Sequence, residues 1–183
     1  MTESGIEKRG NRIILIVAIV TIGLVLDHAS KLWAIQSLKD TGGHSYLGDV
    51  FRLQYAENTG AFLSLGSALS ASLRFWLLTG LNSIILGIVA VVLMTRKSLL
   101  PSMVWALSLI LSGGVGNLID RIFRDGRVVD FMNMGIPWGP IQVRTGIFNV
   151  ADVAIMLGLF IILSAEVFRK APEDGGEAGK KED

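Results

Sequence analysis

The sequence predicts an all-α membrane protein with four transmembrane helices and a small extramembrane β element. Apolar residues make up 51% of the 183 residues and charged residues only 18%, whereas a soluble domain carries about 25% charged residues. The charges are gathered in blocks, and the apolar runs between them approach the length of about 20 residues that a membrane span needs. The stretch "VFRLQYA" (50–56) alternates apolar and polar residues, which is typical of a strand. The length allows one domain.

Four segments meet the requirement for a membrane span, at about 12–35, 75–95, 98–119 and 146–168. The first carries Asp27 and Lys31 near its far end, and the fourth is interrupted once, by Asp152. Only two charged residues, at 96–97, separate the second from the third. A cleaved signal peptide is the alternative for the first segment, but its apolar stretch is long for one and no small-residue cleavage site follows before Lys31.

The rest of the chain divides into a polar N-terminal leader, an outer loop with the β element and a charged tail, at residues 1–11, about 40–67 and 171–183. The membrane domain therefore covers 12–170. The segment "GIPWGP" (135–140) is rich in turn residues. The tail consists of small and charged residues, so we expect it to be disordered.

Four spans place both termini on the same side of the membrane. That side carries nine of the lysines and arginines and the other side seven, so the positive-inside rule favours cytoplasmic termini by a small margin. Trp33 and Trp76 fall near the outer boundary, as interfacial anchors do. The net charge of +1 gives no indication of a nucleic-acid partner.

Polar motifs from distant parts of the chain meet at the outer membrane face in this topology. They are "DHASK", "NTGAF", "GGVGNLIDR", "GRVVDF" and "FNVAD". Ionisable groups in or beside spans are costly and usually functional. Within this set, Arg124, Asp125 and Arg127 are typical of a solvated turn instead.

Four aspartates are candidates for chemistry, but two of them have cations nearby. Asp27 has Lys31 one helical turn later, and Asp120 has Arg121 beside it and Arg124 at i+4. A paired carboxylate has a lowered pKa and is a poor proton shuttle. We therefore expect structural roles for Asp27 and Asp120.

Asp130 and Asp152 lie in apolar surroundings and are the candidate catalytic pair. Two carboxylates that face one another share protons, so one serves as base and the other as acid and together they activate water. With no cysteine and only two histidines, the sequence disfavours a thiol nucleophile, a zinc site and a histidine-assisted serine. A Mg²⁺ ion held by carboxylates remains an alternative.

The five motifs quoted above, in that order among four spans, resemble those of bacterial lipoprotein signal peptidase, also called signal peptidase II, over almost the full length of the chain. The resemblance implies an aspartyl protease of the bacterial cytoplasmic (inner) membrane with its site near the outer face. Such an enzyme cleaves the signal peptide from diacylglyceryl-modified prolipoproteins before the lipidated cysteine, without a metal or cofactor, and is the target of the cyclic peptide globomycin. The catalytic pair is then Asp130 and Asp152, and the polar support is Asp27, Lys31, Asn58, Gly60, Gly113, Asn117, Asp120, Arg121, Asn149 and Ala151.

Roles for some of these residues follow from their chemistry. The amides of Asn58, Asn117 and Asn149 suit substrate backbone or an oxyanion, although Asn149 is also placed to cap the fourth helix. Arg121 suits either Asp120 or a lipid phosphate. Gly113 suits close helix packing. We expect a monomer in contact with membrane phospholipid.

Three other functions are less well supported. A transporter should carry ionisable residues through the depth of the bilayer, whereas "IILGIVAVVL" (84–93) has none. A scaffold protein has no need for four carboxylates gathered with three asparagines. A phosphate-handling membrane enzyme finds support only in the arginine-rich segment 121–127.

Overall fold

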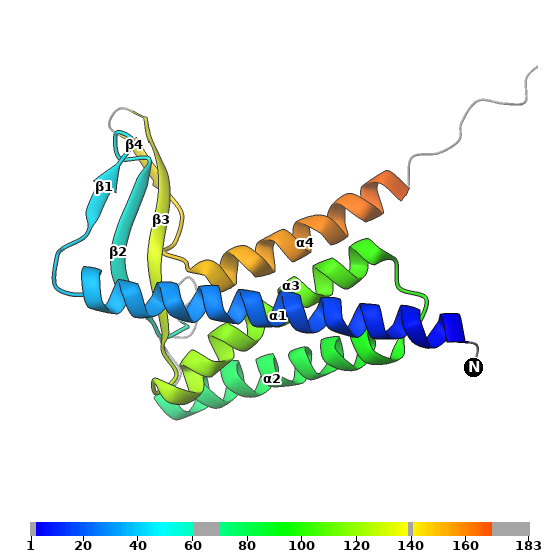
Figure 1. Ribbon diagram of the computed structural model, residues 1–183. Coiled ribbons are helices and arrows are strands. Elements are labelled where there is room, and N and C mark those ends of the chain that lie inside the picture. The colour runs from blue at the N-terminus through cyan, green and yellow to red at the C-terminus, as the bar shows by residue number, and fades with distance from the viewer. Residues whose placement is uncertain (1–2, 61–69, 139–140, 170–183) are drawn as a thin grey trace, which may run out of the picture.

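Four long helices lie side by side and a twisted sheet stands at one end of them (Figure 1). The structure is a computed structural model and describes residues 3–60, 70–138 and 141–169. Its elements are, in chain order, α1 (Glu3–Leu38), β1 (His44–Tyr46), β2 (Phe51–Asn58), α2 (Ala71–Thr95), α3 (Pro101–Phe123), β3 (Val128–Trp138), β4 (Ile141–Arg144) and α4 (Val150–Arg169).

All four helices are long and apolar enough to cross a membrane, over Gly10–Leu38, Ser72–Thr95, Pro101–Phe123 and Val150–Phe168. The predicted four-helix membrane fold with a small β element is thereby confirmed. The helix α1 begins at Glu3, so most of the polar segment 1–11 continues this helix. The tail at 171–183 lies outside the described residues.

Polar side chains fix the ends of the helices. Ser70 caps α2 by accepting a hydrogen bond from the backbone N–H of Leu73 at 3.3 Å. At the other end of α2, Arg12 of α1 donates to the carbonyls of Leu93 (2.6 Å) and Arg96 (2.7 Å). These carbonyls have no partner within the helix, so the arginine supplies the missing donors and joins α1 to α2.

The helix α3 lies at the centre and contacts each of the other three helices. Its buried positions are mostly small residues, among them Ala106, Ser108, Ser112, Gly113, Gly114 and Gly116. Small residues let helix backbones approach closely, which is how helices associate where lipid removes the hydrophobic driving force. The outward faces are apolar; for example, Ile84 and Ile88 of α2 are 63% and 59% exposed, as lipid-facing residues should be.

The sheet is antiparallel with strand order β1-β2-β3-β4. The strand predicted at "VFRLQYA" is β2, but β3 and β4 were not predicted, because the segment 135–140 has the composition of a turn. In the structure Gly135 pairs with Arg144 and Pro137 with Gln142, so pairing with β4 extends the strand through this segment to Trp138. A β-bulge between Leu53 and Ala56 bends β2 against β3.

An apolar cluster joins the sheet to the end of α1. Ala34 and Leu38 of α1 are buried against Phe131 of β3. Further out, Asp49 accepts hydrogen bonds from Arg52 and, at 3.1 Å, from Arg144. The hydrogen bonds from Arg52 hold the pKa of the Asp49 carboxyl well below its usual range. These contacts hold the sheet in place beside the ends of the four helices (Figure 1).

Candidate active site

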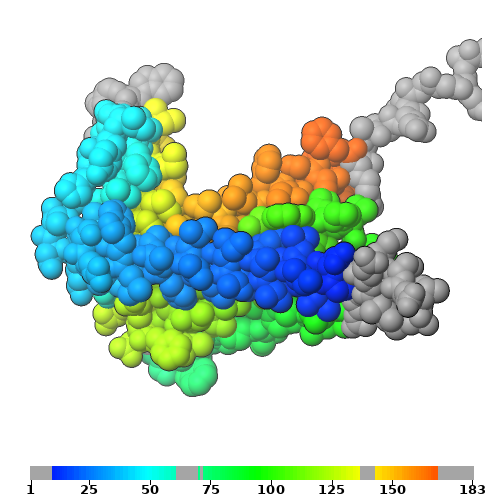
Figure 2. All heavy atoms as spheres, in the orientation of Figure 1, coloured from blue at the N-terminus to red at the C-terminus, as the bar shows by residue number. Residues whose placement is uncertain are grey.

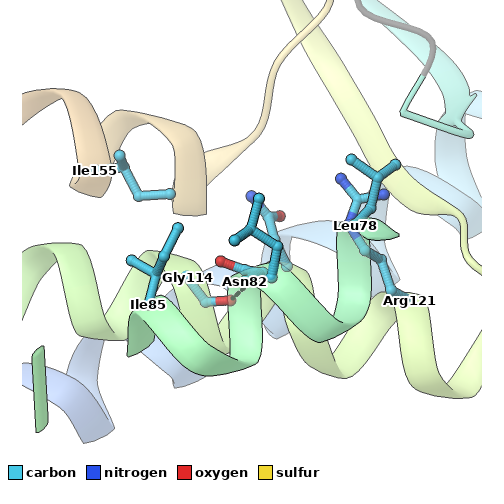
Figure 3. A pocket seen from close by; sticks show the side chains of 8 residues that line it. Leu78, Asn82, Ile85, Gly114, Arg121 and Ile155 are labelled. Carbon is cyan, nitrogen blue, oxygen red and sulfur yellow. Dashed lines mark hydrogen bonds between the residues drawn. The ribbon is translucent and has the colours of Figure 1, made fainter. Parts of the chain in front are cut away.

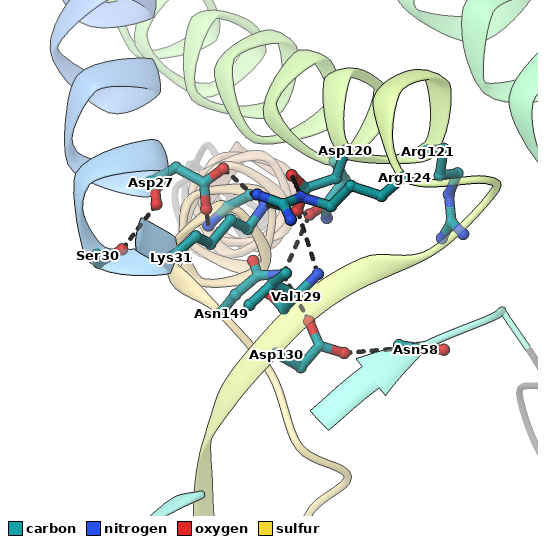
Figure 4. Close-up of polar contacts among 12 residues, drawn as sticks. Asp27, Ser30, Lys31, Asn58, Asp120, Arg121, Arg124, Val129, Asp130 and Asn149 are labelled. Atoms are coloured by element: carbon teal, nitrogen blue, oxygen red, sulfur yellow. Dashed lines mark hydrogen bonds and ion pairs between the residues drawn. The ribbon is translucent and has the colours of Figure 1, made fainter. Parts of the chain in front are cut away.

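Lys31 of α1 is the centre of a buried polar cluster where α1, α3 and α4 meet (Figure 4). Its Nζ lies 2.7 Å from Asp27 Oδ2, 3.0 Å from Asp120 Oδ2 and 3.1 Å from Asn117 Oδ1. Both Lys31 and Asp27 are only 1% exposed. A buried charge needs several partners, and here one lysine serves carboxylates from two helices.

The same carboxylates also hold backbone and a second cation. Asp27 Oδ1 accepts from the N–H of Ala151 at 3.0 Å, which ties α1 to the first turn of α4. Asp120 accepts from Arg124 Nε at 3.1 Å and from the N–H of Val129 at 3.2 Å. The cluster thus holds two carboxylates, Asp27 and Asp120, and two cations, Lys31 and Arg124. Their formal charges cancel.

The predicted pairs Asp27–Lys31 and Asp120–Arg124 are present in the structure. Arg121, in contrast, does not pair with Asp120; its Nη1 donates to the carbonyl of Gly126 at 3.2 Å. Its neighbour Arg124 lies on the Asp120 side of the helix, so only one of the two arginines reaches that carboxylate.

Asp130 of β3 is buried, with 2% of its surface exposed, and each of its oxygens accepts one amide hydrogen bond. Asn149 Nδ2 donates to Oδ1 at 2.6 Å and Asn58 Nδ2 donates to Oδ2 at 3.0 Å. Burial raises the pKa of Asp130 to about 6, and the nearby negative charge of Asp152 also raises it, while the two amides lower it. Asp130 therefore holds a proton far more readily than an ordinary aspartate.

Asp152 lies in the first turn of α4 and is held by a reciprocal cap. Its backbone N–H donates to Asn149 Oδ1 at 2.9 Å, and its Oδ2 accepts from the N–H of Asn149 at 3.1 Å. The second oxygen, Oδ1, accepts from Asn117 Nδ2 at 2.8 Å. The predicted capping role of Asn149 is thus present in the structure.

Asn149 contacts both candidate catalytic carboxylates, through its side-chain amide for Asp130 and its backbone N–H for Asp152. Because the formal charges of the lysine cluster beside them cancel, these two aspartates give the site its formal negative charge. Electrostatic coupling between them accounts for part of the raised pKa of Asp130. Asn149 therefore links the two aspartates within one hydrogen-bonded network.

Three glycines allow the close approaches on which the site depends. A Cβ on Gly116 would lie 2.6 Å from Asp27 Oδ2, and one on Gly113 would lie 2.2 Å from the carbonyl oxygen of Ala151. Gly60 has a φ of +80°, and its N–H donates to Asn58 Oδ1 at 2.8 Å, which orients the Asn58 amide toward Asp130.

An apolar groove of about 280 Å³ runs beside these groups, between α2, α3 and α4 (Figure 3). Its wall includes Leu78, Leu81, Asn82, Ile85, Gly114, Asn117, Arg121 and Ile155. Asn117, which donates a hydrogen bond to Asp152, is part of its lining, so the groove lies beside a residue that holds one of the candidate carboxylates. The sequence analysis did not predict that residues of α2 line a groove. Asn82 was the available signal, because it is an asparagine inside an apolar span.

Known proteins give an independent view of this fold. The family model described as "Signal peptidase (SPase) II" matches residues 19–168. The chain belongs to the signal peptidase II family. It is 33% identical to the lipoprotein signal peptidase of Borrelia duttonii, with 87% of this chain and 94% of that protein covered. The lipoprotein signal peptidase of Treponema pallidum is 35% identical, with 77% of each chain covered.

Two solved structures, each described as a bacterial membrane enzyme, share the fold. Both superpose with a TM-score of 0.71, at 22% and 23% identity, and they cover 90% and 86% of this chain and 94% of their own. This chain is therefore a multi-pass membrane protease of the signal peptidase II family, of the aspartic class.

In this signal peptidase II fold, nearly all the residues predicted for the site come together at one end of the helices. Asp27, Lys31, Asn117, Asp120, Asn149 and Ala151 form a continuous hydrogen-bonded network with Asp130 and Asp152, and Asn58 reaches it from β2. Gly60 and Gly113 act through backbone packing and Arg121 lines the groove. Among the described residues there is no group of three or more potential metal ligands.

Proposed function

We propose that this protease removes the signal peptide from diacylglyceryl-modified prolipoproteins and cleaves just before the lipidated cysteine, with a water molecule activated between Asp130 and Asp152. The names of its relatives support the substrate class. The observation that carries the mechanism is the different environment of the two carboxylates. Asp130 is buried with a pKa of about 6, whereas Asp152 is partly exposed at a helix N-terminus.

This asymmetry favours one distribution of roles. Asp130 holds the shared proton and acts as the acid, and Asp152 is the ionised base. As water attacks the scissile carbonyl, Asp152 takes one of its protons and Asp130 gives its own to the carbonyl oxygen, which yields a neutral tetrahedral diol. Return of a proton from Asp152 to the departing nitrogen, with loss of a diol proton to Asp130, releases the amine and restores the pair.

The neighbouring residues position this chemistry. Asn149 and Asn117 fix the carboxylates, and Lys31 neutralises the carboxylates behind them, so that no other buried negative charge competes for the proton. The apolar groove beside Asn117 is a suitable binding place for the hydrophobic part of a signal peptide or for acyl chains. Figure 2 shows a notch between the sheet and α4, which a substrate chain could enter.

The proposal extends to the setting of the enzyme. The motif resemblance and the small excess of basic residues on the terminal side support the cytoplasmic membrane, cytoplasmic termini and a site at the outer face. A single chain contains every residue of the site, which supports a monomer. A globomycin-like cyclic peptide is then expected to occupy the same groove and inhibit cleavage.

The test uses purified protein with a lipidated prolipoprotein and reads the mass of the products. Asp130→Asn and Asp152→Asn should each abolish the release of the signal peptide while circular dichroism and thermal melting show a folded protein. Turnover by either folded variant close to that of the wild type would reject the pair. Activity should persist in excess chelator, and a loss that added metal restores would favour the Mg²⁺ alternative.

A further inference from the structure

The groove between α2, α3 and α4 has a polar residue on its α2 wall, Asn82 (Figure 3). The other residues that α2 contributes to the lining are Leu78, Leu81 and Ile85. Asn82 is partly buried, and its Nδ2 donates to the backbone carbonyl of Gly114 at 3.3 Å. The proposed activation of water does not use this residue. A polar side chain inside a membrane span is costly and indicates a function.

The amide of Asn82 has unused hydrogen-bonding capacity. A carboxamide can donate two hydrogen bonds and accept two, whereas Asn82 makes one hydrogen bond within the described part of the chain and its Oδ1 accepts none there. An acyl chain in the groove would cover this oxygen without offering it a donor, and a polar group that loses water without gaining a partner costs free energy. The chemistry of the α2 wall therefore favours an occupant with N–H donors.

The packing of α2 against α3 does not depend on this amide. Leu86, one turn further along α2, is buried, and a Cβ added to Gly114 would lie 2.3 Å from its Cδ2, so the two helices approach closely there. The hydrogen bond from Asn82 to the Gly114 carbonyl is long, and hydrogen bonds between membrane helices contribute little to stability on average. A structural role therefore uses only a small part of the capacity of this amide.

The distance of Asn82 from the candidate pair indicates which part of a substrate it meets. Gly114 precedes Asn117 by three residues on α3, a rise of about 4.5 Å, and Asn117 donates to Asp152. The Asn82 amide thus lies about one helical turn from the candidate pair, on the side away from the sheet. An extended peptide advances about 3.3 Å per residue, so this separation corresponds to about two residues from the cleaved bond.

We propose that Asn82 positions the substrate by accepting, through Oδ1, a hydrogen bond from a backbone N–H of the signal peptide about two residues before the cleaved bond. A segment held extended at membrane depth exposes backbone N–H groups that lipid cannot satisfy, and Asn82 supplies an acceptor at that depth. The groove then holds the signal peptide, and the acyl chains of the substrate lie elsewhere. This inference rests on the proposed function, because the occupant is the substrate of that reaction.

The experiment measures the affinity of synthetic diacylglyceryl-modified signal peptides for the full-length protein in detergent. Two proteins are compared, Asp130→Asn, which should leave the peptide intact, and the double variant that also carries Asn82→Leu. In a series of peptides, each of the four residues before the cleaved bond in turn has its backbone N–H replaced by an ester oxygen. One of these esters should weaken binding to Asp130→Asn by about three- to tenfold and binding to the double variant by less than about twofold.

This dependence on one position of the peptide separates a substrate contact from a structural role, because disturbed helix packing would weaken the binding of all the peptides alike. Ester effects that are equal in both proteins at every position would overturn the inference. Unchanged or tighter binding of the parent peptide by the double variant would overturn it as well, and is the result expected if acyl chains fill the groove.

Ser83→Leu, added to Asp130→Asn, is the matched control, because Ser83 is the exposed neighbour of Asn82 on α2 and its hydroxyl donates to the carbonyl of Thr79 on the same helix at 2.7 Å. This control should keep both the affinity and the ester effect. Failure of the wild type to cleave the parent peptide would count against the proposed function instead, and the affinities would still decide the role of Asn82.

Discussion

The side-chain amide of Asn149 donates to Asp130 Oδ1 at 2.6 Å. The same asparagine exchanges hydrogen bonds with Asp152 as the cap of α4. The position of one carboxylate is therefore tied to the start of the helix that carries the other. This link makes Asn149 a positioning residue whose loss should alter proton affinity as well as geometry.

Asn149→Ser separates these two roles, because a serine still caps the helix but has no amide for Asp130. If Asp130 holds the shared proton, kcat/KM of the wild type falls as the pH rises through its pKa of about 6. The Asn149 hydrogen bond lowers that pKa, so the variant should have a higher one. We expect the basic limb of the kcat/KM profile to move to higher pH and the maximum to fall by about ten- to a hundredfold.

Gln36→Ser is the control for this profile, because Gln36 is exposed on α1 near the same membrane face. It should leave both limbs in place. A shift of the basic limb of Asn149→Ser toward lower pH would contradict the assignment of the proton to Asp130.

The raised pKa of Asp130 also has a consequence for stability. The folded protein binds this proton more tightly than the unfolded chain, so the contribution is complete below the unfolded value of 3.8 and is lost as the pH rises through about 6. The difference corresponds to about 3 kcal/mol. Asp130→Asn should therefore flatten the decline of the melting temperature between pH 4 and 7, measured in detergent. Asp40→Asn, which changes an exposed carboxylate, is the control, and its melting temperature should decline with pH as that of the wild type does. If the melting temperature of Asp130→Asn declined equally steeply, protonation of Asp130 would not be the source of the pH dependence.

The sequence predicted the local pairs of the site and the four helices, because both depend on short-range spacing. Asp27 and Lys31 are four residues apart on one helix, so their contact follows from helical geometry. The meeting of polar motifs at one face followed from the number of spans. The predicted pair of Asp130 and Asp152 stays a prediction that the variants above test.

Contacts between distant residues could not be predicted in the same way. The ion pair of Lys31 with Asp120 joins α1 to α3 and depends on how the helices pack. The strand β3 was missed because Gly135 and Pro137 favour turns locally, and only pairing with β4 makes them extended. For Arg121, the sequence left open a pairing with Asp120 or with a lipid phosphate; the first does not occur, because neighbouring residues on a helix point about 100° apart.

Lys31 stabilises two buried carboxylates at once, and its removal should be severe. Lys31→Met leaves Asp27 and Asp120 buried without this cation, which we expect to cost about 3–5 kcal/mol of unfolding free energy. Adding Asp27→Asn should restore part of that loss, because it removes the carboxylate whose ion pair in the described residues is with Lys31, whereas Asp120 keeps its ion pair with Arg124. The measurement is thermal or SDS-induced unfolding in detergent.

Lys39→Met is the matched control, since this exposed lysine lies just after the same helix and its ammonium lies over the ring of Tyr55. It should change stability by less than about 1 kcal/mol. An equal loss in both lysine variants, or no recovery in the double variant, would show that Lys31 does not act through the buried carboxylates.

Gly113 sets the distance between α3 and the start of α4. A Cβ here would lie 2.2 Å from the carbonyl oxygen of Ala151, which is backbone and cannot rotate away, so Gly113→Ala must displace α4. Because Asp152 follows Ala151, its contact with Asn117 should be disturbed. We expect a loss of about 1–3 kcal/mol and more than about tenfold in kcat. Gly80→Ala on α2, where a Cβ meets nothing within 4 Å, is the control and should be neutral or stabilising by up to about 1 kcal/mol. If both variants were equally stable and active, close packing at Gly113 would not be what positions Asp152.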